Sequence, residues 1–161
     1  MAKKIRPVNA YVRAFTALTP DNVERLYDLV ADDVFFTDPF NVIHGKCGFR
    51  RIFDHMFETC TDPRFTVSDV AHSDTASYLR WQMTGQLKSW PHTNLLFEGM
   101  TEVHVNPEGL ICQHIDHWDS ASQLMRHLPV IGAIIRPILK LFQLNHFLIW
   151  ESQLEFQGLP F

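Results

Sequence analysis

The spacing of apolar residues changes from helical to strand-like near Phe65, and this change limits the folds that the chain can adopt. Before Phe65, apolar side chains recur every three or four residues, as they do on one face of a helix. After Phe65 they alternate or run continuously at strand length, in the segments 65–70, 76–88, 95–105 and 110–118. The last two segments are joined by Asn106-Pro107-Glu108-Gly109, a sequence typical of a hairpin turn.

The part of the chain before Phe65 predicts three helices. Thr19-Pro20-Asp21 separates the first from the second, because threonine can cap a helix and proline and aspartate suit its first turn. Gly45 precedes the third helix, and Thr61-Asp62-Pro63 closes it. The apolar faces of the three helices are, in order, Val8, Tyr11, Val12, Phe15 and Leu18; Val23, Leu26, Tyr27 and Val30; and Phe49, Ile52, Phe53, Met56 and Phe57. We therefore expect an α+β fold in which a curved, largely antiparallel sheet wraps around three N-terminal helices.

One short strand lies among the predicted helices and ends at a carboxylate. Val34, Phe36 and Asp38 alternate onto one face, which sets Asp38 at the end of an apolar row. Pro39 cannot donate a hydrogen bond to a neighbouring strand, so strand pairing stops there and a cavity mouth can open. An Asp-Pro pair is also common at surface turns, and a purely structural interpretation therefore stays open.

Length and composition predict one globular domain. The chain has 161 residues, of which 46% are hydrophobic and 20% are charged, and this is enough apolar material to bury a core. A net charge of −4 without a basic cluster argues against nucleic acid as a partner. Three scattered cysteines, Cys47, Cys60 and Cys112, predict free thiols in a reducing compartment. Because no apolar segment follows the basic residues at the start, we expect no signal peptide and a cytoplasmic protein.

The order of these features resembles a known superfamily. The motifs that carry the resemblance are Ala31-Asp32-Asp33 with Asp38-Pro39, the glycine Gly45 before the third helix, and Ile111-x-x-His114-x-Asp116-x-Trp118-Asp119 at the end of the hairpins. In this order and spacing the chain resembles the nuclear transport factor 2-like superfamily, and within it the SnoaL-like and ketosteroid-isomerase-like branch. The resemblance covers residues 8 to 120.

This resemblance implies a cone-shaped fold, a cystatin-like α+β roll, in which the bent sheet and the helices surround a deep apolar pocket. It also implies a homodimer formed through the open face of the sheet. Residues 1–120 would form the SnoaL-like domain, and residues 121–161 would form an apolar helical extension packed on that domain or on a partner subunit. The superfamily contains isomerases, polyketide cyclases, dehydratases, epoxide hydrolases and non-catalytic binders, so the fold alone does not define a reaction.

Asp38 matches the position at which ketosteroid isomerases carry their catalytic base. Apolar surroundings disfavour the charged form of a carboxylate, and this suits such a group to proton transfer. The isomerases also use a tyrosine and a protonated aspartate as donors to the oxyanion. These positions fall near Ala14 and Thr101 here, with Tyr11 one turn earlier, so a steroid isomerase is not expected. Tyr11 or Thr101 would instead donate to a substrate oxygen.

A second group of candidate catalytic residues lies on the last predicted strand. His114, Asp116 and Trp118 share one face with Cys112, and this face lines the pocket if the register follows the family. His114 and Asp116 could form an imidazole–carboxylate pair or flank a substrate enol. SnoaL-like cyclases carry an acid/base aspartate in this part of the sheet, and Asp116 matches it. Non-catalytic relatives use the same residue types for structural hydrogen bonds, so both interpretations stay open.

Aromatic residues complete the predicted pocket for an apolar small molecule. With Tyr11 and Thr101, the residues expected to contact a ligand are Phe36, Phe53, Trp81 and Trp118. Nine histidines occur, but no His-x-His, Cys-x-x-Cys, glycine-rich phosphate loop or Gly-x-Ser-x-Gly sequence accompanies them. We therefore expect neither a metal ion nor a cofactor.

The chain ends in a strongly apolar segment. Ser120-Ala121-Ser122-Gln123 fits a capping box that begins a helix, and Pro137 is expected to bend or split the helix that follows Pro129. The helical stripe consists of Ile131, Ile134, Ile135, Ile138, Leu139 and Phe142, with Arg136, Lys140 and Gln143 outside it. Residues 129–142 are too few to span a membrane, so they would form a lid, pack on a partner subunit or lie on a membrane surface. We favour lid or subunit packing, and we expect residues 147–161 to dock back on the body.

Two functional hypotheses follow from the sequence. In the first, the protein is an isomerase, cyclase or dehydratase in which Asp38 or Asp116 moves a proton on an apolar substrate with the help of His114. In the second, it is a non-catalytic small-molecule binder or a protein-interaction module of the same fold. Structural hydrogen bonds that occupy both carboxylates would favour the second hypothesis.

Overall fold

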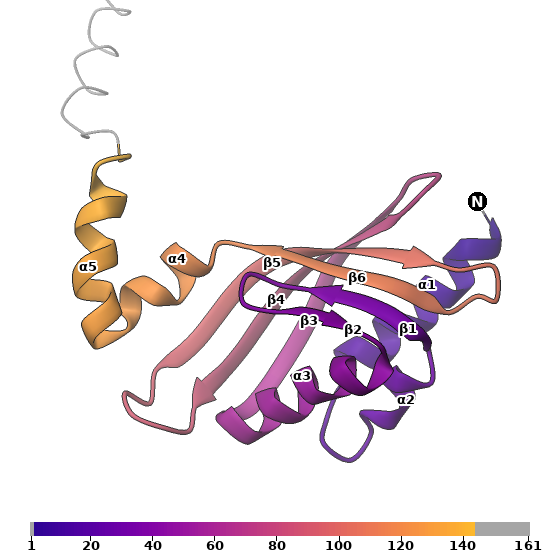
Figure 1. Ribbon diagram of the computed structural model, residues 1–161, viewed down its shortest axis with the longest axis horizontal. Helices are drawn as coiled ribbons and strands as arrows, with labels where there is room; N and C mark the ends of the chain where they lie inside the picture. Colours follow the sequence, from indigo (N-terminus) through magenta and orange to yellow (C-terminus); the bar gives the residue numbers. More distant parts are fainter. Residues whose placement is uncertain (1, 144–161) are drawn as a thin grey trace, which may run out of the picture.

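The computed structural model describes residues 2–143, and its body is a strongly curved six-stranded sheet with helices on its concave side (Figure 1). In chain order the elements are α1 (Ala2–Thr16), α2 (Glu24–Tyr27), β1 (Val30–Thr37), β2 (Val42–His44), α3 (Lys46–Thr59), β3 (Cys60–His72), β4 (Ser77–Leu87), β5 (Asn94–Val105), β6 (Ile111–Trp118), α4 (Ser120–Gln123), the 3-10 helix η1 (Met125–His127) and α5 (Pro129–Lys140). The predicted α+β class with an N-terminal helical layer, a curved sheet and a C-terminal helix is confirmed.

The strands lie in the order β2-β1-β6-β5-β4-β3. Strands β3 to β6 pair antiparallel with their chain neighbours, whereas β1 lies parallel to β6 and carries β2 on its free edge. The register of the β3–β4 pair shifts twice, once between Thr61 and Arg64 and once between Val67 and Asp69. Such bulges increase local twist and bend a strand, which fits the curvature of this part of the sheet.

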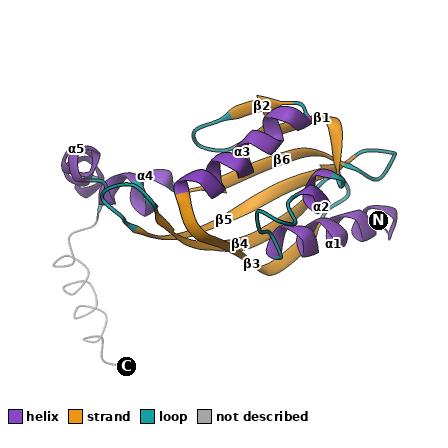
Figure 2. Cartoon of the chain, turned by 90° about the horizontal axis from the view of Figure 1, so that it is seen from below, coloured by secondary structure: helices purple, strands orange, loops and turns teal. Residues whose placement is uncertain are grey.

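The core lies between the concave face of the sheet and the helices α1 and α3, as Figure 2 shows from below. Alternation along β4 directs Ser77, Leu79, Trp81 and Met83 inward and leaves the side chains between them half-buried or exposed. The helices contribute large apolar side chains to the same layer: Val8, Tyr11, Phe15, Phe49 and Phe53. These apolar faces hold the helices against the sheet, because burial of each such side chain contributes about 1.5–3 kcal/mol.

Two sequence predictions about the boundaries of elements are wrong, and one strand was not predicted. The second helix is a single turn, and Val30, predicted on its apolar face, begins β1 opposite Ile111 of β6. Thr61-Asp62-Pro63 was predicted to close the third helix, but α3 ends at Thr59 and these residues lie within β3. Pro63 is tolerated there because β3 is an edge strand with a bulge at this point. The short strand β2 was not predicted, since three residues give no readable period.

The segment after β6 also differs from its prediction in detail. The helix α4 is capped by Asp119, whose carboxylate accepts from the Ser122 amide at 2.9 Å, and not by a capping box beginning at Ser120. Pro137 lies inside α5 and does not split it, because proline removes only one backbone hydrogen bond close to the end of this helix. The Gln123 side chain fixes α4 to the sheet through both backbone groups of Glu98.

The helix α5 packs mainly on η1 and extends from one end of the body (Figure 1). Within residues 2–143, none of the helices has the length and apolarity required to cross a bilayer. The predicted docking of residues 147–161 lies outside the described residues.

Candidate functional site

An apolar cavity of about 240 Å³ opens between α3, β1 and the concave face of the sheet. Two carboxylates, Asp38 and Asp116, lie on its wall. The other lining residues are mainly aromatic or aliphatic and are Phe15, Phe36, Asn41, Ile52, Phe53, His55, Met56, Thr59, Cys60, Phe65, Trp81, Met83, Leu95, Phe97 and Trp118. A cavity with an apolar wall and few polar groups is the usual form of a small-molecule site.

Asp116 joins the cavity to a buried polar network. Its Oδ1 accepts a hydrogen bond from the Thr101 hydroxyl, and that hydroxyl accepts from the indole N–H of Trp81 at 2.8 Å. Thr101 and Asp116 are directly opposite one another in the β5–β6 register, which places the two side chains on the same concave face. Within residues 2–143, no hydrogen bond reaches Oδ2, the other oxygen of Asp116. One carboxylate oxygen is thus held by the protein, and the other has no hydrogen-bond partner among the described residues.

His114 lies behind Asp116 and is 99% buried. Its Nε2 lies 3.1 Å from Oδ1 of Asp116, but the two groups are not aligned for a hydrogen bond, and Nε2 has no other partner in the described part of the chain. The imidazole is enclosed by aromatic rings, with ring centroids 5.1 to 6.0 Å away, from Tyr11, Phe15, Phe36 and Phe49. Catalytic hydrogen bonds are commonly misaligned before the ligand binds, so this contact can tighten in a complex.

Tyr11 completes the network from the side of α1. Its hydroxyl is 2.7 Å from Nδ1 of His114. Burial raises the pKa of Tyr11 well above its usual value, with a further increase from the nearby charge of Asp116, so the phenol keeps its proton. Tyr11 can therefore donate to Nδ1, and the ring proton then lies on Nε2 and faces Asp116.

Asp38 is held in a different way from Asp116. Its Oδ1 accepts from the backbone N–H groups of Phe40 and Asn41, both at 2.7 Å, and the Asn41 side-chain amide reaches both carboxylate oxygens at 3.0 Å. This is an Asx-type turn that ends β1. It also orients Phe40, whose ring meets that of Trp118 edge to face at 5.6 Å. Asp38 therefore lines the cavity while its donors come from its own turn.

The predicted site residues fall into two groups in the structure. Asp38, Asp116 and the predicted aromatic contacts line the cavity, namely Phe36, Phe53, Trp81 and Trp118. The others, Tyr11, Thr101 and His114, are buried behind the wall, and their polar atoms face each other or Asp116. The two predicted oxyanion donors, Tyr11 and Thr101, are thus engaged inside the protein.

Sequence reasoning missed several cavity residues, and a periodic signal could have found only some of them. Leu95 and Phe97 of β5 share the inward face of Thr101 by simple alternation, and both line the cavity. Gly99, between Phe97 and Thr101, leaves space for two tryptophans, since a Cβ there would lie 2.6 Å from the Trp81 ring and 2.9 Å from Cβ of Trp118. His55 and Asn41 had no periodic signal, because both reach the cavity from beyond the predicted apolar stripes.

The fold and the cavity together define an open α+β cone with a small-molecule-sized apolar interior. Residues 8–114 match the family model of the SnoaL-like domain, and the chain belongs to this family. A search of curated proteins found no relative of this sequence.

Solved structures with the same fold have low sequence identity to this chain. A nuclear transport factor 2-like protein of unknown function from Burkholderia pseudomallei matches with a TM-score of 0.64 and 15% identity, over 76% of this chain and 95% of its own. SalBIII, described as an epoxide hydrolase/cyclase-like enzyme in pyran ring formation in the polyether salinomycin, matches with a TM-score of 0.62 and 14% identity, over 73% and 92%. A Mycobacterium tuberculosis protein in complex with estradiol-17beta-hemisuccinate matches with a TM-score of 0.58 and 18% identity, over 73% and 94%. These likenesses show the fold.

Proposed function

We propose that this protein is a small acid–base enzyme that moves a proton on an apolar substrate, and that Asp116 is the catalytic residue. The observation that carries the proposal is the network of Tyr11, His114, Asp116 and Thr101, which ends at the cavity wall with one carboxylate oxygen unpaired among the described residues. Buried polar groups are costly to arrange, and a network that ends at a cavity fits a functional group better than a packing device.

In the proposed reaction, Oδ2 of Asp116 takes a proton from a carbon next to a substrate carbonyl. The C–H bond breaks, its electron pair enters the carbonyl system to give an enolate, and an O–H bond forms on Asp116. The carboxyl group then returns the proton to another atom of the substrate, as an isomerisation, cyclisation or dehydration requires. His114 acts as a positioning residue, because its Nε2–H can stabilise Oδ1 when the carboxylate is charged.

The lining of the cavity is the evidence for an apolar substrate that contains rings. Its volume of about 240 Å³ and its aromatic lining suit a molecule with a flat carbon skeleton. Two structures with this fold, one described as epoxide hydrolase/cyclase-like and one bound to a steroid ester, are consistent with this substrate class.

The second candidate function is non-catalytic binding of the same class of molecule. Asp38 supports it, because within residues 2–143 all the donors that reach this carboxylate come from its own turn. In this case Asp38 and Asp116 would only give polarity to the cavity rim. A protein-interaction module of this fold is the further alternative.

The test begins with native mass spectrometry of the protein purified from a cell extract, followed by denaturing extraction of the bound compound. The compound is then returned to the protein in deuterated water, and deuterium in its carbon skeleton is measured by mass spectrometry. An enzyme of the proposed kind incorporates deuterium at a carbon position, and the Asp116→Asn variant binds the compound without incorporation. Binding with no incorporation by the wild-type protein supports the carrier, and a protein that carries only a partner chain supports the interaction module.

We also infer a homodimer formed through the outer face of the sheet. Met100 is 41% exposed on this face, beside the half-exposed Tyr78 and the exposed Arg80. Light scattering should give twice the monomer mass for the wild-type protein and the monomer mass for Met100→Lys. A monomeric wild-type protein would contradict this inference.

A further inference from the structure

The helix α5 exposes the largest group of apolar side chains on the described surface. Residues 46 to 83% exposed on it and just after it are Val130, Ile131, Ile134, Ile138, Leu141 and Phe142. With helical spacing these side chains form one continuous face, which we call the α5 apolar face. A face of this kind usually marks a site of contact, because soluble proteins rarely leave so many large apolar side chains together in water.

The direction of this face is fixed by how α5 packs. Gly132 lies against η1, where a side chain would collide with the backbone of Arg126, and Arg136 donates to the Arg126 carbonyl at 3.2 Å. The half-buried Ile135 and Leu139 share the packed side with Gly132. The α5 apolar face is consequently turned away from η1.

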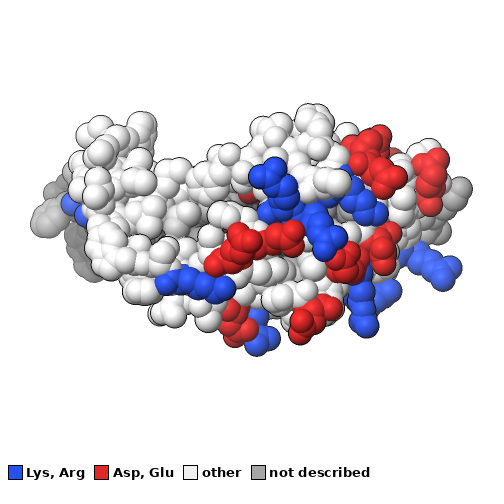
Figure 3. Space-filling view, turned by 60° about the horizontal axis from the view of Figure 1, so that its bottom comes forward, with Lys and Arg blue, Asp and Glu red and all other residues white. Residues whose placement is uncertain are grey.

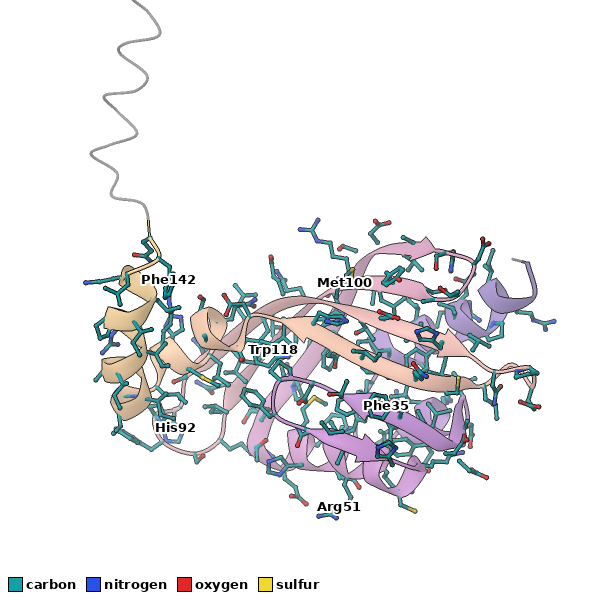
Figure 4. The ribbon with its side chains drawn as sticks, turned by 45° about the horizontal axis from the view of Figure 1, so that its top comes forward. Phe35, Arg51, His92, Met100, Trp118 and Phe142 are labelled. Carbon is teal, nitrogen blue, oxygen red and sulfur yellow. The ribbon has the colours of Figure 1, made fainter. Side chains whose placement is uncertain are left out.

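The position of α5 argues against a lid. None of the described residues after Trp118 lines the cavity. Figure 4 shows Phe142 at the end of α5, well apart from Trp118 on the cavity wall. The predicted closure of the pocket by this segment is therefore not supported by its position.

Charge distinguishes between the remaining partners. Between Ser120 and Gln143 three side chains are basic, Arg126, Arg136 and Lys140, and none is acidic, although the whole chain has a net charge of −4. Two copies that met through the α5 apolar face would pair two segments that carry basic side chains and no acidic ones. An anionic lipid surface would accept the apolar side chains and neutralise the cations at the same time.

A second apolar group lies at the same end of the molecule. Figure 4 shows His92, in the β4–β5 hairpin, at the end that carries Phe142. The same hairpin carries Trp90, which is 73% exposed. Tryptophan is enriched at membrane interfaces because its ring is apolar and its N–H is polar. On the face shown in Figure 3, few charged side chains lie at this end of the molecule, and most of the acidic and basic residues lie over the middle and the opposite end.

We propose that the α5 apolar face, with Lys140 at its edge and Arg126 and Arg136 in the same segment, docks the protein on an anionic bilayer surface. The helix would lie in the headgroup region with its apolar side chains among the upper acyl chains, and Trp90 would make a second contact. The proposal does not depend on the reaction at the cavity. Trp118, which lines the cavity, lies just before α4. The cavity would then lie near the bilayer, which is a source of apolar molecules.

Flotation with vesicles tests the proposal on the full chain. The wild-type protein should float with vesicles of phosphatidylcholine and phosphatidylglycerol, should bind vesicles of phosphatidylcholine alone more weakly, and should lose binding as salt is raised. Ile134→Gln and Phe142→Gln should each lower the partition constant about tenfold or more, given a contribution of about 1.5 kcal/mol or more for a fully buried side chain. Lys140→Gln should lower it about fivefold, since one basic residue near such a surface contributes about 1 kcal/mol.

Ala133→Gln is the matched control, because Ala133 is exposed on α5 outside the apolar face, and this variant should bind as the wild type does. The proposal is overturned if the wild-type protein binds neither vesicle, or if the Ile134 and Phe142 variants bind unchanged. It is also overturned if light scattering gives a dimer that Ile134→Gln converts to a monomer while vesicle binding is absent, because a second copy then covers the face. The deuterium experiment at the cavity is unaffected by any of these results.

Discussion

Asp38 and Asp116 line the same cavity, but the protein holds them in opposite ways. The hydrogen bonds to Asp38 come from residues two and three positions further along the chain. Those to Asp116 come from another strand, Thr101 being fifteen positions away, and the network continues to Tyr11, which is 103 positions from His114. The first arrangement is a turn that many chains could form. The second exists only when α1, β5 and β6 are in place.

This difference separates local geometry from a site built by the fold. An aspartate at the end of a strand satisfies its oxygens from its own turn whether or not it has a function. A carboxylate supported by a buried imidazole and a buried tyrosine requires polar atoms to be placed inside an aromatic core, where each unpaired group is costly. We therefore propose that Asp116 is the catalytic residue. Asp38 then has a structural role, in shaping the rim of the cavity.

The largest expected effect is on turnover of the bound compound. Asp116→Asn should reduce the rate of deuterium incorporation by about 10² to 10⁴, the usual contribution of a positioned general base. Asp38→Asn should reduce it by less than about tenfold, because an amide oxygen can still accept from the backbone of the turn. The rates are compared by mass spectrometry at equal occupancy of the cavity. An equal loss in both variants would remove the distinction between the two carboxylates.

The next effect concerns stability. Tyr11→Phe leaves Nδ1 of the buried His114 without its partner and should lower the free energy of unfolding by about 1–3 kcal/mol. Tyr27→Phe is the matched control, since the Tyr27 hydroxyl donates to the backbone carbonyl of the exposed Arg50, and about 0.5–1.5 kcal/mol is expected. Urea unfolding of both variants gives the comparison. Equal costs would mean that Tyr11 is only a packing residue.

A smaller effect is expected in the turn itself. Asn41→Ala removes the amide that bridges the two oxygens of Asp38 and should lower stability by about 1 kcal/mol. Because the backbone donors of the turn stay in place, deuterium incorporation should be almost unchanged. A large loss of activity in this variant, at full occupancy of the cavity, would transfer the catalytic role to Asp38.

Asp119 gives the smallest effect, and it is held locally as Asp38 is. The backbone N–H of Ser122 lowers the pKa of Asp119 below its usual value, so its charged form stabilises the fold. This stabilisation is present above the unfolded-state pKa of about 3.9 and is lost as the pH falls through the lower folded-state pKa. Asp119→Ala should cost about 0.5 kcal/mol at neutral pH.

Asp119→Asn is the control for this cap, because asparagine caps a helix about as well as aspartate. Asp119→Asn should keep most of the stability at neutral pH. It should not show the loss of stability that protonation of Asp119 causes in the wild type as the pH falls. Thermal unfolding at neutral and acid pH measures both variants. A pH dependence that is the same in Asp119→Asn and the wild type would contradict the assignment to this carboxylate.

Much of the fold could be predicted from the sequence because its signals are periodic. Inward residues of β4 such as Leu79 and Trp81 followed from alternation, and Asn106-Pro107-Glu108-Gly109 marked a turn that closes with Gly109 donating to Asn106. The start of β1 at Val30 could not be predicted in this way, because it depends on pairing with Ile111, which lies eighty-one positions later. Long-range strand pairing overrides local propensity.

The candidate site was predictable only in part, for the same reason. The spacing of two residues between His114 and Asp116 predicted that they share a strand face. Phe36 and Trp81 were predicted to contact a ligand. The sequence could not reveal that Tyr11 and Thr101 would face His114 and Asp116, because those contacts join residues far apart in the chain. It also could not show that Asp38 would satisfy its oxygens within its own turn.

A crystal structure of Asp116→Asn with the co-purified compound tests the central assignment most directly. The asparagine retains the shape of the site and prevents turnover, so the substrate position can be observed. We predict that the carbon atom that exchanges deuterium lies about 3–3.5 Å from the residue 116 side chain, as a near-attack geometry requires. A compound whose exchanging carbon instead lies against Asp38, with residue 116 facing only Thr101 and His114, would contradict the assignment.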